Sequence, residues 1–70
     1  MKYQLTQIRK EAAQFTVKMR AEMAGESWVI RNPGTRYGLC LLKDRHGQYN
    51  EAVYIKDARS NFIGFLAYAD

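Results

Sequence analysis

The fold is expected to depend on residues 5–24, which read LTQIRKEAAQFTVKMRAEMA. Apolar side chains recur there every three or four positions, at Leu5, Ile8, Ala12, Phe15, Met19 and Met23. That spacing places them on one stripe of an α-helix. Gly25 follows at once, and glycine most readily adopts the left-handed conformation that ends a helix. The sequence therefore predicts one amphipathic helix over residues 5–24, with Met19 and Met23 in its core stripe.

The rest of the chain is typical of short strands joined by turns. Residues 32–35 read NPGT, which fits a type II turn, and residues 44–47 read DRHG, which fits a turn ending in a glycine bulge. These signals divide the chain into predicted strands over residues 27–31, 36–43 and 48–56. The last segment, residues 62–69, is predicted as a fourth strand because it is rich in aromatic residues and contains Gly64. A terminal helix is the alternative for it.

The two turns determine which residues lie opposite each other. Counting from the first turn sets Ile30 opposite Tyr37, and counting from the second sets Tyr37 opposite Ile55. Both counts put most apolar side chains on one face, where the helix is expected to pack: Trp28, Ile30, Tyr37, Leu39, Leu41, Val53 and Ile55. We therefore predict an α+β fold and a single domain over residues 1–70. Its N-terminal helix packs on a three- to four-stranded antiparallel β-meander.

The opposite face of this sheet is half apolar, and the one predicted helix cannot cover it. An exposed apolar face usually marks an interface. A small-residue strip on the outward side of the helix is a second candidate surface, although good helix formers on a solvated face would explain it equally well. The predicted partner interface therefore comprises Val29, Cys40, Leu42, Tyr54 and Phe65 on the sheet and Ala13, Val17 and Ala21 on the helix.

Positive charge indicates a second kind of partner. The 70 residues carry a net charge of +4. Arg31, Arg36 and Lys56 are predicted cross-strand neighbours on the uncovered face, where a bound anion would offset their repulsion. Tyr54 on the same face could stack on a nucleic-acid base. The predicted nucleic-acid contacts are these four residues together with Arg9 and Arg20, which flank the helix stripe. The alternative is that the cations extend into water and protect the sheet edge.

No motif specifies a reaction, a metal or a cofactor. Cys40 is the single cysteine and His46 the single histidine, and neither shows metal-ligand spacing. We therefore predict no catalytic, cofactor-binding or metal-ligating residues, no small-molecule substrate and no membrane partner. A lone thiol and the absence of a signal-peptide core favour a cytoplasmic protein.

The expected function is that of a small non-enzymatic interaction or regulatory protein. It would dock a protein surface, most simply that of a second copy in a homodimer. The size of the chain, the lack of active-site chemistry and the uncovered sheet face favour this interpretation. The alternative is a small basic nucleic-acid-binding protein that uses a cationic and aromatic sheet face.

Overall fold

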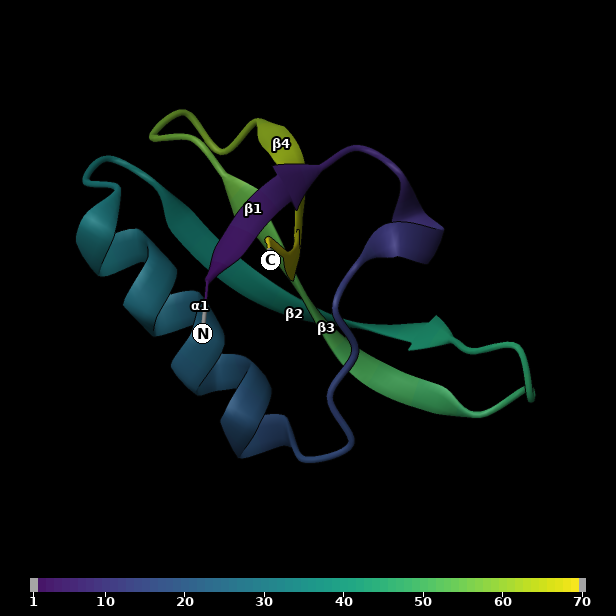
Figure 1. Cartoon of the computed structure of the whole chain (residues 1–70). Coiled ribbons are helices and arrows are strands. Elements are labelled where there is room, and N and C mark those ends of the chain that lie inside the picture. Colours follow the sequence, from purple (N-terminus) through teal and green to yellow (C-terminus); the bar gives the residue numbers. More distant parts are fainter. Residues whose placement is uncertain (1, 70) are drawn as a thin grey trace.

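A computed structural model describes residues 2–69 of the chain (Figure 1). In order, these residues form strand β1 (Tyr3–Thr6), the 3-10 turn η1 (Arg9–Glu11), helix α1 (Lys18–Arg31), and strands β2 (Arg36–Lys43), β3 (Tyr49–Lys56) and β4 (Phe62–Tyr68). Within this described part, the four strands pair antiparallel in the order β1-β4-β3-β2, and α1 packs on β2 and β3. The predicted α+β class, one helix on an antiparallel sheet, is confirmed.

The helix begins later in the chain than its predicted bounds. It shares residues 18–24 with the prediction, but residues 5–17 form the end of β1, the turn η1 and an extended segment. Long-range backbone hydrogen bonds replace helical ones in this region. The amide of Ala13 donates to the carbonyl of Leu66, and the amide of Phe15 donates to that of Glu51, both at 2.8 Å. Partners far away in the sequence therefore decide the conformation of residues that satisfy a helical pattern locally.

Residues 27–31 were predicted to be a strand and instead form the last turns of α1. The predicted pairing of Ile30 with Tyr37 is therefore wrong. Gly25 lies inside the helix, where its lack of a side chain lets α1 approach the ring of Tyr37. The turn over residues 32–35 does exist, with Gly34 at φ 90°, but it joins a helix to a strand. A turn signal shows where the chain changes direction, but it does not show whether a helix or a strand precedes the turn.

The pairing of β2 with β3 agrees with the prediction. Tyr37 lies opposite Ile55, and Leu39 lies opposite Val53. Residues 62–68 form the predicted fourth strand, with an irregularity in the pairing between Ile55 and Lys56. Near it, Gly64 has φ 155°, which changes the alternation of side chains along β4.

The irregularity places Phe62 and Phe65 on the same face of the sheet, although they are three residues apart. Their rings make an edge-to-face contact with centroids 5.1 Å apart. With uninterrupted alternation, Phe65 would share its face with Ile63, and Phe62 would lie on the opposite face. Ile63 instead packs against the core beneath α1.

Two apolar clusters fill the interior, one on each side of the sheet. The cluster between α1 and the sheet consists of Ala13, Phe15, Ala21, Ala24, Val53, Ile55 and Leu66. The cluster on the far side consists of Ala12, Leu42, Ala52 and Phe65, with Cys40 and Tyr54 packed against it. The far face is therefore partly filled by the segment after η1. Six of the twelve buried apolar residues in the described part are alanines, so the core contains few large side chains.

Two aspartates hold the turns that connect β2 to β3 and β3 to β4. The carboxylate of Asp44 accepts hydrogen bonds from the amides of Gln48 and His46, at 2.9 and 2.8 Å. Asp57 repeats this geometry with the amides of Asn61 and Arg59, at 2.9 and 2.8 Å. The amide of Gln48 is the main cause that lowers the pKa of Asp44, and the amide of Asn61 is the main cause that lowers that of Asp57.

These turns are expected to make the fold sensitive to acid. A carboxyl group with a lowered pKa stabilises the fold above its ordinary pKa of 3.8, and this stabilisation is lost as the pH falls through the folded value. We expect the double variant Asp44→Asn/Asp57→Asn, whose amides do not titrate, to lose less stability below about pH 4. Urea unfolding measured at several pH values tests this. Identical pH slopes for wild type and variant would contradict it.

Candidate interaction surfaces

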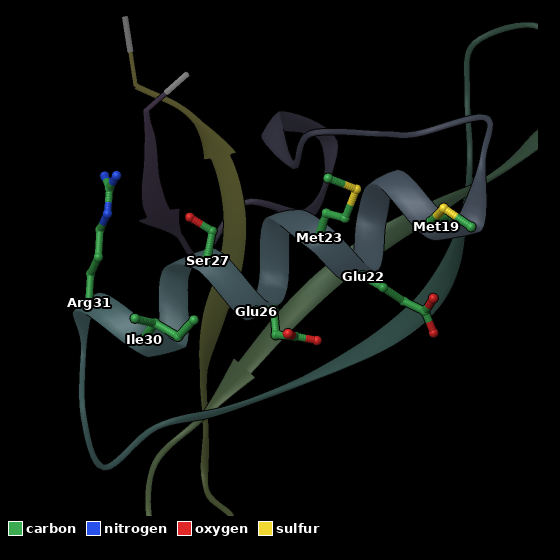
Figure 2. A pocket seen from close by; sticks show the side chains of 7 residues that line it. All are labelled: Met19, Glu22, Met23, Glu26, Ser27, Ile30 and Arg31. Atoms are coloured by element: carbon green, nitrogen blue, oxygen red, sulfur yellow. The ribbon is translucent and has the colours of Figure 1, made fainter.

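Helix α1 turns small side chains toward the sheet, with Trp28 partly buried beside them, and turns several large apolar side chains outward. Ala21, Ala24 and Gly25 are buried, whereas Met19, Met23 and Ile30 are 65, 65 and 72% exposed. The exposed three lie along one line of the helix, as Figure 2 shows, and we call them the Met/Ile ridge. Met19 and Met23 were predicted to lie in the core. That prediction is wrong because small residues, which allow a closer approach, form the buried side of α1.

An open groove of about 700 Å³ lies beside the ridge, between α1 and strands β1 and β4. Three aromatic side chains line it, with the ring of Tyr3 5.6 Å from that of Tyr68 and 6.4 Å from that of Phe15. Burial, and then the neighbouring Tyr68, raise the pKa of Tyr3. We call this hollow the aromatic groove. Met19 and Met23 belong to both features, so ridge and groove adjoin each other. The charged side chains of Glu22, Glu26 and Arg31 lie along the ridge, and Arg20 lies at the groove.

The predicted small-residue strip on the helix is absent from the described residues. Ala13 lies before α1 and is buried, and Ala21 is buried against the sheet. Val17, the residue that precedes α1, is half exposed and lines the aromatic groove. Val29 lies on α1 instead of the sheet and is partly buried.

The predicted apolar patch on the far sheet face is mostly interior. Leu42 and Phe65 are buried, while Cys40 and Tyr54 are partly buried against the same cluster. The prediction of a bare face failed because Ala12 packs against it. Burial raises the pKa of the Cys40 thiol, and the guanidinium of Arg9 opposes that rise. Arg9 begins η1, and its carbonyl accepts a hydrogen bond from the amide of Ala12, which packs in this cluster.

A row of three side chains crosses the far face at the end of the sheet away from the β2–β3 hairpin tip. Arg36 lies opposite Lys56, as predicted, and Lys56 lies opposite Phe62 in β4. The ring of Tyr54 lies over Gly38, and the ammonium of Lys56 is 5.5 Å from that ring. Both contacts compete with stacking on Tyr54, whereas Phe62 is 48% exposed. We call Phe62, Lys56 and Arg36 the cross-strand row.

The remaining predicted nucleic-acid contacts lie elsewhere. Arg20 lines the aromatic groove, and Arg31 lies in the last turn of α1 beside the ridge. A further basic hollow, which the sequence reasoning missed, lies at the tip of the β2–β3 hairpin. It is lined by Lys10, Ala12, Gln14, Lys43, Asp44, Arg45 and His46. Only the packing of η1 and its following segment near the hairpin brings Lys10 to this hollow.

No three histidine, cysteine, aspartate or glutamate side chains among residues 2–69 gather into a set that could hold a metal ion. The helix in this part of the chain lacks the length and apolarity needed to cross a membrane.

Comparison with protein-family models, curated proteins and solved structures finds no match for this chain. Function is therefore inferred from the surfaces themselves.

Proposed function

We propose that this chain is a small interaction protein that associates with a second copy of itself through the Met/Ile ridge and the aromatic groove. The observation that carries the proposal is the outward placement of Met19, Met23 and Ile30 on one helix, next to a groove of matching chemistry. Single exposed apolar residues are ordinary on protein surfaces. Exposed apolar side chains grouped beside an aromatic groove and rimmed by charged residues usually mark an interface.

The arrangement of ridge and groove favours a second copy as the partner. A two-fold axis brings the same surface of two molecules together, so the ridge of each can enter the groove of the other. Methionine side chains are flexible and make favourable contacts with aromatic rings. Met19 and Met23 on one copy therefore match Tyr3, Phe15 and Tyr68 on the other.

The surface area of the chain supports the same partner. Its accessible surface is 5100 Å², about 600 Å² more than the roughly 4,500 Å² expected for a folded monomer of 8.1 kDa. A specific interface typically buries about 800 Å² on each partner, so the excess is of the size that a dimer would remove. The alanine-rich core also buries few large side chains, which leaves the monomer with a small hydrophobic contribution to stability.

Met23→Glu is expected to convert the dimer into a monomer. The new carboxylate would lie where the ridge meets the groove of the second copy, and burial of an unpaired charge is strongly unfavourable. Sedimentation velocity over about 1–100 μM protein should show a dimer for the wild type and a monomer for the variant. Circular dichroism would establish that the variant keeps its fold, since Met23 is 65% exposed in the monomer.

Tyr49→Glu is the matched control. Tyr49 is 62% exposed on β3, opposite Lys43 and outside both the ridge and the groove. The same change of an exposed apolar residue to glutamate should leave the dimer intact there. A wild type that remains monomeric at the highest concentration would contradict the proposal. So would equal effects of the two substitutions on self-association.

A further inference from the structure

We infer that the sheet face turned away from α1 binds single-stranded nucleic acid along a line of cations that runs beside strands β2 and β3. This activity goes beyond self-association and uses a different surface. It assigns base stacking to Phe62 and phosphate contacts to Arg36, Lys56, Arg9 and Lys10.

The cross-strand row supplies the first part of the site. Neighbouring strands lie about 4.8 Å apart, so one aromatic ring and two cations follow each other over about 10 Å. Two like charges directly opposite each other destabilise a sheet, and a bound phosphate would offset the repulsion between Arg36 and Lys56. Phe62 is half exposed at the β4 end of the row, where an unpaired base could stack on its ring.

The turn next to the row leaves this end of the sheet positive. Asp57, which follows Lys56 directly, uses its carboxylate to accept hydrogen bonds from the amides of Arg59 and Asn61. Its charge is thereby held toward the backbone of the turn. The side chain of Arg59 in the same turn is exposed and adds a further cation beside the row.

The positive surface continues to the opposite end of the hairpin. Arg9 lies in η1 next to Ala12, which packs on the far face. Lys10, Lys43 and Arg45 line the hollow at the hairpin tip, together with the acid Asp44. Strand β2 has eight residues, which corresponds to a length of about 27 Å. Cations at both ends of this length match an extended chain of phosphates.

The exposed ring beside the cations favours a single strand over other polyanions. A duplex keeps its bases stacked inside, so Phe62 would have no base to contact, whereas unpaired bases stack on aromatic side chains. A membrane surface offers anionic headgroups and no bases. RNA and DNA share the chemistry that the surface recognises, so both are included in the test.

The test uses fluorescence anisotropy with labelled RNA and DNA oligonucleotides of about 12 nucleotides at ~50 mM salt, where electrostatic binding is strongest. Single strands should bind, and duplexes of the same sequence should bind more weakly. For single strands, the slope of log K against log salt is about −0.7 per neutralised phosphate. Arg36→Gln/Lys56→Gln should therefore make this slope less steep by about 1.4.

A matched pair of substitutions separates the site from the overall charge. Lys2→Gln/Lys18→Gln removes the same two charges from exposed positions outside the cross-strand row and should change affinity far less. Phe62→Leu keeps an apolar side chain and removes the ring, and should weaken binding about tenfold because stacking contributes ~1–3 kcal/mol per base. Met23→Glu lies on the opposite surface and should retain binding to a single strand, so dimerisation and nucleic-acid binding are tested independently.

Several results would overturn the inference. One is the absence of binding to both RNA and DNA at ~50 mM salt, because weak electrostatic contacts are detectable there. Another is an equal loss of affinity in the two double variants, which would show a response to net charge alone. Binding to the duplex as tight as to the single strand would exclude the stacking role of Phe62. Binding to phosphatidylserine vesicles without oligonucleotide binding would identify a membrane surface instead.

Discussion

Leu66→Ala is expected to lower the free energy of unfolding by about 4 kcal/mol, within the ~2–5 kcal/mol range for such substitutions in protein cores. Leu66 is fully buried in β4, and its carbonyl accepts the hydrogen bond from Ala13. Ala21 and Ala24, in the same cluster, have no rotamers with which to fill the space left by the removed atoms. The cavity should therefore persist, which places the loss in the upper part of that range.

The effect is large relative to the stability of the whole domain. At ~0.05–0.15 kcal/mol per residue, a chain of 70 residues has a total stability of about 4–10 kcal/mol. Urea unfolding at a fixed protein concentration measures the change, since self-association would make stability depend on concentration. Leu41→Ala is the control and should cost less than about 0.5 kcal/mol, because this side chain is largely exposed. Equal losses in the two variants would show that the β4 layer is not the centre of the core.

Gly25→Val is expected to destabilise the fold by about 3 kcal/mol, at the upper end of the usual cost of overpacking. A Cβ atom at Gly25 would overlap the ring of Tyr37, so a side chain requires either the ring or the helix to move. Movement of α1 away from β2 would also separate Ala21 and Ala24 from the sheet. Glycine inside a helix is about 1 kcal/mol less favourable than alanine, so the close approach must compensate for this loss.

A double-mutant cycle with Gly25→Ala and Tyr37→Ala tests the cause. In the wild-type background, Gly25→Ala should destabilise because its methyl group meets the ring. In the Tyr37→Ala background the same substitution should stabilise by up to about 1 kcal/mol, the difference in helix propensity. The change of sign is measurable by urea unfolding. If Gly25→Ala has the same effect in both backgrounds, contact with Tyr37 is not what requires glycine.

The features predicted correctly are those that local chemistry decides. The DRHG turn and the alternation of apolar residues on both sides of it predict the β2–β3 register, which the structure confirms from Arg36↔Lys56 to Lys43↔Tyr49. A slip of one residue would exchange the two faces of the sheet, so the pattern allows one solution. The position of β4 also follows from its composition and from the turn before it.

The helix bounds were predicted poorly because two conformations fit the same residues. Leu5 and Ile8 continue the helical stripe, yet residues 3–6 pair with residues 65–68 of β4. No short-range sequence signal indicates a pairing strand some sixty residues away. The sequence predicts a helix end at Gly25 because glycine is common there. Its actual role depends on the ring of Tyr37, which approaches only after folding.

By itself, the sequence determined the α+β class, the β2–β3 hairpin and the positive charge, since turn chemistry, side-chain alternation and composition act over short distances. Tertiary structure alone decided the position of the functional candidates. Packing of the smallest side of α1 against the sheet exposed Met19 and Met23, and the irregularity near Gly64 brought Phe62 onto the face that carries Lys56. Both outcomes depend on how closely two backbones approach, and that distance is set by contacts between residues far apart in the chain.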